Sequence, residues 1–118
     1  MKNFRFLELR VYQDTKIFHR KVVYYTKHWS KEFDYLKNQL RRVALSVVLN
    51  IAEGSGKSSD KDFNRYIKNS LGSINESASC VDTAFDERLL EKIVYKELLS
   101  SAMNLKNSLG SLSKKLKS

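Results

Sequence analysis

The sequence has no proline, only four glycines and a single cysteine. With so few turn-forming residues, a loop-rich β-sandwich or a collagen-like chain is excluded, and helix is favoured as the dominant element. The lone cysteine, Cys80, allows neither an intrachain disulfide nor a zinc site built from several cysteines of one chain. Such sparing use of cysteine is typical of a reducing compartment, so we expect a cytoplasmic protein.

Long apolar stretches are also absent. The most apolar segment, residues 43–52, is far shorter than the roughly 20 residues that a transmembrane helix needs, and Ser46 and Asn50 interrupt it. Residues 1–5 lead into no continuous apolar stretch of the kind found in signal peptides. The sequence therefore predicts a soluble protein that does not bind membranes.

The composition that remains suits one folded domain covering residues 1–118. A chain of 118 residues can bury roughly two-thirds of its unfolded surface, and a hydrophobic content of 42% supplies a core. Positive charge predominates, because 22 Lys and Arg face 13 Asp and Glu and give a formal net charge of +9.

Apolar residues recur every three or four positions in four segments, which is the spacing of one face of a helix. Short breaks near residues 28–30, 54–58 and 86–88 separate the segments. Ser30 and Ser59 are expected to cap the second and third helices, and Gly54 or Gly56 to end the second in the left-handed conformation. We expect an all-α fold, an antiparallel up-down-up-down four-helix bundle.

The positions expected to face the core follow from this spacing. They are Val11, Thr15, Phe18, Val22, Tyr25 and Trp29 in the first segment; Leu36, Leu40, Val43, Val47 and Ile51 in the second; Phe63, Ile67, Ser70, Ile74, Ser77, Val81 and Ala84 in the third; and Leu98, Ala102, Leu105, Leu109, Leu112 and Leu116 in the fourth.

No residue pattern indicates catalysis or metal binding. Residues 56–58 read Gly-Lys-Ser, like the end of a phosphate-binding loop, but Ile51 stands where that motif needs glycine, and a helix precedes it. Both histidines, His19 and His28, belong to the first segment, and neither follows a glutamate at the spacing of a di-iron site. We expect no enzymatic activity, no cofactor and no metal.

Polar residues form a stripe beside the apolar stripe of the second segment, and a shorter stripe follows the third. Such stripes form a hydrogen-bond network between helices, a subunit interface or an ordinary solvated face. We favour a structural network or interface, in which Arg42 would pair with Glu53 or Glu76. The predicted network residues are Gln39, Arg42, Ser46, Asn50, Glu53, Ser73 and Glu76.

The positive charge predicts binding to RNA or DNA through phosphate neutralisation. Four tyrosines would add stacking surfaces if exposed: Tyr12, Tyr24, Tyr35 and Tyr66. Two alternatives remain open: the lysines serve solubility alone, or the protein is a scaffold that binds another protein. The cations predicted to hold nucleic acid lie on or near the hairpin of the second and third segments: Lys37, Arg41, Lys57, Lys61, Arg65 and Lys68.

Three stretches resemble a known family. Residues 39–54, QLRRVALSVVLNIAEG, resemble the signature Q-x-R-R-A-x-x-S-I-P-x-N-I-A-E-G of the bacterial four helix bundle protein family. This family includes proteins encoded in intervening sequences of 23S ribosomal RNA genes. Residues 71–76, LGSINE, resemble its second signature, and residues 6–13, FLELRVYQ, resemble its start. Val48 departs from the pattern, because the family often has proline there.

The resemblance implies a left-handed antiparallel four-helix bundle that forms homo-oligomers, with pentameric rings as the expected assembly. Related accessory proteins of diversity-generating retroelements form similar basic barrels that engage nucleic acid and a reverse transcriptase. The resemblance also places the residues of the polar stripes among the family's signature positions. It implies no catalytic role, and the departure at Val48 implies a straighter second helix.

Overall fold

Four long helices make up the fold of this protein. The computed structural model describes residues 4–117, so residues 1–3, on which the absence of a signal peptide partly rests, lie outside the described part. The helices are α1 (Arg10–Tyr25), α2 (Asp34–Ser55), α3 (Asp60–Asp86) and α4 (Lys92–Lys117), with short 3-10 helices η1 (Arg5–Glu8) and η2 (Lys31–Phe33) before α1 and α2.

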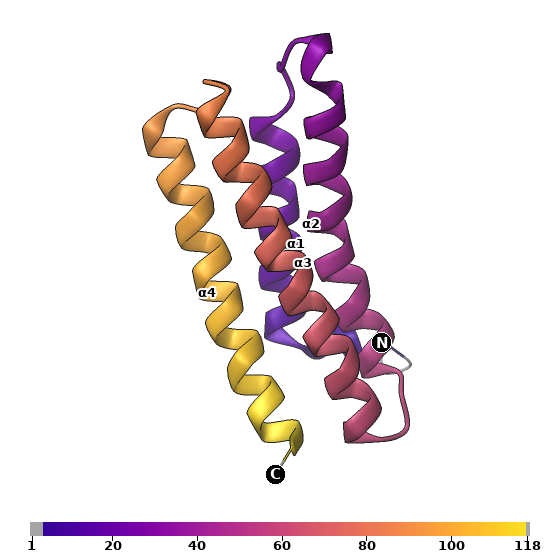
Figure 1. Cartoon of the computed structure of the whole chain (residues 1–118). Helices are drawn as coiled ribbons and strands as arrows, with labels where there is room; N and C mark the ends of the chain where they lie inside the picture. Colours follow the sequence, from indigo (N-terminus) through magenta and orange to yellow (C-terminus); the bar gives the residue numbers. More distant parts are fainter. Residues whose placement is uncertain (1–3, 118) are drawn as a thin grey trace.

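The helices run alternately up and down, so that the start of α1 and the end of α4 lie at the end of the bundle where α2 turns into α3 (Figure 1). Each helix packs against its neighbours in sequence, and α1 closes the bundle against α4. The bundle measures 44 × 25 × 19 Å. This all-α, antiparallel four-helix bundle confirms the predicted fold class. No helix within residues 4–117 combines the length and the apolar character that crossing a bilayer requires.

The core contains the predicted apolar faces. Every core position expected in α2 and α3 is buried, and α4 buries its stripe from Leu98 to Leu109. Leu112 and Leu116, in the last two turns of α4, are partly buried against the same core. The helix α2 is continuous through Val48, where the family often has proline. The apolar spacing therefore places the core correctly.

Small residues bring α2 and α3 close together. Ser70 is fully buried, and its hydroxyl donates across the interface to the carbonyl oxygen of Val47 at 3.0 Å. Gly54 is buried too, and a Cβ built on it would lie 2.7 Å from the Cβ of Tyr66 and 3.2 Å from the carbonyl oxygen of Phe63. Because no side chain fits there, Gly54 is needed for the approach of the two helices.

The prediction that Gly54 or Gly56 ends α2 in the left-handed conformation is wrong. Gly54 is helical, and Gly56 has a φ of −87°. The backbone of Gly56 has right-handed helical dihedral angles. The Gly56 amide donates to the carbonyl oxygen of Glu53, and the Lys57 amide donates to that of Gly54. Within residues 4–117 the positive φ falls on Arg88, at 61°, after α3.

The two predicted caps have different outcomes. Ser59 caps α3, since its hydroxyl accepts a hydrogen bond from the backbone amide of Asp62 at 3.1 Å. The prediction that Ser30 caps the second helix is wrong, because a 3-10 turn separates Ser30 from α2. The carbonyl of Ser30, rather than its side chain, accepts from the amide of Phe33.

Candidate functional site

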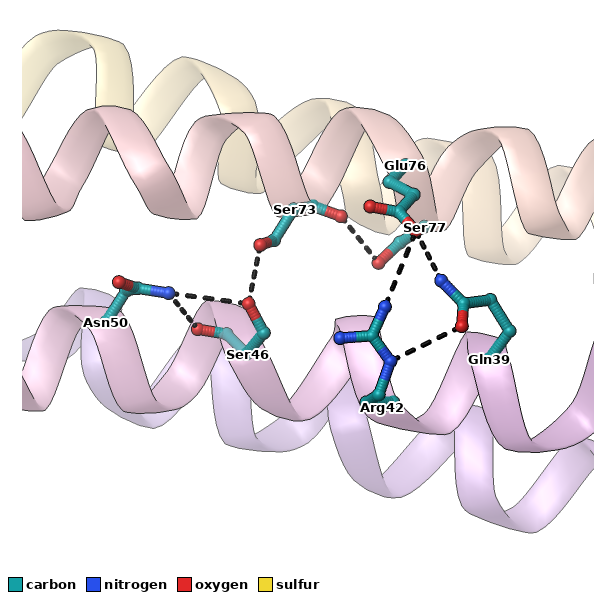
Figure 2. Close-up of polar contacts among 7 residues, drawn as sticks. All are labelled: Gln39, Arg42, Ser46, Asn50, Ser73, Glu76 and Ser77. Carbon is teal, nitrogen blue, oxygen red and sulfur yellow. Dashed lines mark hydrogen bonds and ion pairs between the residues drawn. The ribbon is translucent and has the colours of Figure 1, made fainter.

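One group of polar contacts joins α2 to α3 at the surface (Figure 2). The side-chain amide of Gln39 donates to a carboxylate oxygen of Glu76, and the Arg42 guanidinium lies 3.9 Å from the same oxygen. Arg42 also donates from Nε to the Gln39 amide oxygen at 3.3 Å. The Arg42 and Glu76 side chains are 66% and 50% exposed, so water screens their attraction and the ion pair contributes at most about 1 kcal/mol.

A second group lies further along the same interface and is less exposed (Figure 2). The hydroxyls of Ser46 and Ser73 are 2.6 Å apart and share a hydrogen bond between the helices. The Asn50 amide donates to the carbonyl oxygen of Ser46 at 2.9 Å, and Ser77 donates to that of Ser73 at 2.8 Å. These bonds fix side chains at the rim of the α2–α3 contact.

The structure thus brings together the predicted network residues except Glu53. Glu53 points to the following turn, where its carboxylate lies 3.5 Å from the Lys57 ammonium. Of the two partners left open for Arg42, Glu76 is the one in contact. The stripe is neither fully buried nor fully solvated, because Ser46, Asn50 and Ser73 are half-buried.

Exposed leucines border this stripe. Leu45 and Leu49 lie one turn apart on the outer side of α2 and are 40% and 55% exposed. Leu49 also lines a groove of about 510 Å³ together with Phe4, Phe6 and Ala52. The analysis of the sequence did not include these residues in a site, although leucine at outward positions of an amphipathic helix is the feature that would have indicated them.

Two of the predicted nucleic-acid-binding cations, Arg41 and Lys37, contact other residues of the chain. The Arg41 guanidinium donates to the Thr26 hydroxyl at 2.8 Å and to the carbonyl oxygen of Val23 at 3.1 Å, at the end of α1. Lys37 lies 3.3 Å from a carboxylate oxygen of Asp34. Arg41 in particular has a structural role, because it satisfies a carbonyl that the helix end leaves free.

The cations at the α2–α3 turn gather around one aromatic ring. The Lys57 ammonium and the Arg65 guanidinium each lie 5.2 Å from the centroid of the Tyr66 ring, a cation–π distance. Arg65 lies 3.7 Å from a carboxylate oxygen of Asp62, and Lys57 is paired with Glu53. The ring of Tyr66 is therefore already in contact with cations of its own chain.

Lys61 and Lys68 differ from the other predicted cations. Both are exposed, and neither forms an ion pair with any residue of the described chain. Tyr24 and Tyr35, predicted as stacking surfaces, are 67% and 65% exposed. Lys61 and Lys68 belong to α3, whereas the two tyrosines belong to α1 and α2. Tyr24 instead lines a groove with the exposed cations Arg20 and Lys27.

Among the remaining reactive side chains, Cys80 is buried, His19 is partly buried and His28 is exposed. Burial, and to a lesser extent the nearby Glu76 carboxylate, raises the pKa of the Cys80 thiol and keeps it protonated. Burial lowers the pKa of His19, and Arg41 and Arg20 lower it further. Within residues 4–117 no three His, Cys, Asp or Glu side chains lie close enough together to hold a metal ion.

The antiparallel helices, the polar α2–α3 rim and the exposed cations define a basic, all-α four-helix-bundle protein. The family model for the 23S rRNA-intervening sequence protein matches residues 7–111, and the chain belongs to this family. The family resemblance noted in the sequence is thereby confirmed. No curated protein matches the chain.

Proposed function

We propose that this protein is a non-enzymatic, oligomeric helical bundle of the cytoplasm that binds RNA or DNA with low sequence specificity. The observation that carries the proposal is the surplus of cations, a net charge of +9, part of which lies on exposed helix faces without carboxylate partners. The description of the family links it to a ribosomal RNA gene, which supports a role that involves nucleic acid.

Binding of this kind rests on the phosphate backbone. Lysine and arginine side chains neutralise phosphates and release condensed counterions, which gives affinity with little dependence on sequence. The fold is a bundle of long helices and belongs to none of the common modules that read base edges. Low specificity follows from that architecture.

The test is fluorescence anisotropy of labelled single-stranded RNA, duplex RNA and duplex DNA, titrated with the protein at several salt concentrations. We expect the logarithm of the association constant to fall linearly with the logarithm of the salt concentration. The slope reports the number of phosphates contacted. Absence of binding to all three probes at low salt would overturn the proposal.

Charge reversal at Lys57, Lys61 and Arg65 tests the surface that the sequence indicated. The triple variant is expected to bind RNA more weakly without unfolding, because all three residues lie at the α2–α3 end of the bundle and none is buried. Circular dichroism is the control for folding. Binding as tight as that of the parent protein would show that this end does not contact nucleic acid.

Self-assembly, with a pentameric ring as the family's expected form, is part of the proposal. It is supported by Leu45 and Leu49, which expose apolar surface on α2 beside half-buried hydrogen-bonding groups. Light scattering coupled to size-exclusion chromatography is expected to give a homo-oligomer for the parent protein. The variant Leu45→Glu/Leu49→Glu is expected to give a folded monomer. A parent protein that is monomeric would contradict self-assembly.

A protein-interaction scaffold is the second candidate. The groove that Phe4, Phe6 and Leu49 line together with the charged residues Arg5, Glu53 and Lys57 favours it, because exposed apolar surface rimmed by polar residues commonly marks protein contacts. This candidate predicts a specific protein partner that stays bound after nuclease treatment and is lost in Leu49→Glu. If nuclease releases every bound protein, the scaffold function is excluded.

A further inference from the structure

We propose that a single strand of RNA lies along the groove between α3 and α4, with its phosphates held by Lys68, Lys106 and Lys114. This inference rests on the proposed nucleic-acid binding and assigns it to one surface. Lys106 and Lys114 were not among the predicted site residues. The residues that line the groove lie in the C-terminal half of α4 and in the N-terminal half of α3. Figure 1 shows that these halves lie side by side.

The groove is an open channel of about 500 Å³ between the two helices. It is lined by Leu71 of α3 and, from α4, by Lys106, Asn107, Gly110, Ser111 and Lys114. Gly110 has open space where a side chain would project, since a Cβ built there meets no atom within 4 Å. A ligand can therefore approach the α4 backbone between the two lysines.

The pairing of the helices places Lys68 beside the opposite wall, which Leu71 of α3 lines. The Ser113 hydroxyl donates to the Asn64 amide oxygen at 2.6 Å, which fixes the register of α4 against α3. Because the two helices are antiparallel, Lys68, one turn beyond Asn64, lies across the groove from Gly110. Lys106 and Lys114 on α4 and Lys68 on α3 thus lie around the open space at Gly110.

The charges of these lysines are uncompensated. Residues 63–75 of α3 and residues 98–117 of α4 contain no Asp or Glu. Lys68, Lys106 and Lys114 are exposed, and each lacks an ion-pair partner among the residues that the structure describes. Most acidic residues of this helix pair lie towards its other end: Glu76, Asp82, Asp86, Glu87, Glu91 and Glu97. Asp60 and Asp62 lie in the first turn of α3, where Asp62 is paired with Arg65.

The spacing of the lysines suits one nucleic-acid strand. Lys106 and Lys114 are eight residues apart on α4, about 12 Å along the helix, which spans on the order of two to four phosphates. A positive groove that follows one backbone is the usual way to bind a single strand without reading its sequence. Asn107 and Ser111 add neutral hydrogen-bonding groups to the same wall.

The experiment compares two triple variants that lower the net charge equally. Lys68→Gln/Lys106→Gln/Lys114→Gln removes the groove lysines, and Lys31→Gln/Lys92→Gln/Lys96→Gln removes three exposed lysines at the other end of the bundle. Binding of labelled single-stranded RNA and of labelled duplex RNA is measured at several salt concentrations. The groove variant should bind about ten- to hundredfold more weakly, with a salt slope smaller by about 2, whereas the control should stay close to the parent.

The outcomes separate the two proposals. Equal losses in both variants would overturn the groove and leave nucleic-acid binding in place as a diffuse surface property. A groove variant that loses duplex binding but keeps single-stranded RNA would overturn the single-strand assignment. Absence of binding by the parent protein itself would overturn both proposals.

A second pair of variants leaves every lysine intact. Gly110→Glu places a carboxylate between Lys106 and Lys114, whereas Gly110→Ala adds only a methyl group in open space. Both should fold, as monitored by circular dichroism and thermal unfolding. We expect Gly110→Glu to weaken RNA binding severalfold and Gly110→Ala to leave it unchanged. Equal affinity of the two variants would contradict the groove.

Discussion

The two helices α2 and α3 pack tightly at Gly54, where there is no room for a methyl group. A Cβ at this position would fall 2.9 Å from the Phe63 ring and 2.7 Å from Tyr66. Gly72 and Gly110 are also within helices, but a Cβ on either meets nothing within 4 Å. Close packing therefore requires glycine at position 54 but not at positions 72 and 110.

The matching prediction concerns stability. Gly54→Ala should lower the free energy of unfolding by about 1–3 kcal/mol, the usual cost of overpacking. Gly72→Ala and Gly110→Ala should raise it by about 0.5–1 kcal/mol, because alanine favours helix over glycine. Urea unfolding of the three variants checks this, and a Gly54→Ala protein as stable as the parent would contradict the close approach.

His19 gives the fold a dependence on pH. Its pKa lies below the ordinary value of 6.5, because burial and then Arg41 and Arg20 disfavour the charged form. The folded state thus binds this proton less readily than the unfolded chain, so stability falls as pH drops below about 6.5 and the loss levels off below the folded pKa. Urea midpoints between pH 7.5 and 5 should fall less in His19→Gln than in the parent protein. Identical pH profiles would contradict this role.

At the scale of the helices, Arg41 joins the end of α1 to α2. The buried Thr26 donates its hydroxyl hydrogen to the carbonyl of Val22 and accepts from Arg41, which also satisfies the carbonyl of Val23. One side chain of α2 therefore completes the hydrogen bonding of a helix end that has no glycine cap.

Removing this link should destabilise the bundle more than removing Lys37, a partly exposed cation whose ion-pair partner, Asp34, lies on the same helix. Arg41→Gln is expected to lower the free energy of unfolding by about 1–3 kcal/mol, because buried acceptors lose their partner. Lys37→Gln, on the same helix and paired only at the surface, should stay within about 0.5 kcal/mol. Thermal unfolding of both variants is the measurement, and equal effects would exclude the structural role of Arg41.

The helices and their buried faces could be predicted from the sequence because a spacing of three and four is a local property. Ser59 was found for the same reason, since its hydrogen bond to Asp62 closes within one turn. The turn geometry at Gly56 and the positive φ at Arg88 were not found, because they depend on how neighbouring helices meet. Likewise, the polar stripe was visible in the sequence, whereas the groove between α3 and α4 depends on the register of two helices.

At the scale of the whole molecule, the net charge of +9 acts on stability and on binding in opposite directions. Repulsion among like charges weakens the compact state, and salt screens it with a Debye length of about 10 Å at 0.1 M. We expect the thermal midpoint to rise between low salt and about 0.5 M NaCl while RNA binding falls over the same range. A midpoint that decreases with salt would show that attractive ion pairs dominate.

The groove between α3 and α4 has walls from two helices that are synthesised one after the other. While the ribosome is still making α4, the α4-facing side of α3, including Leu71, has no partner, and only one wall of the channel exists. Domains fold as units once their last element is available. A nascent chain therefore lacks the channel, and the protein acquires it only after the fourth helix has left the exit tunnel and docked.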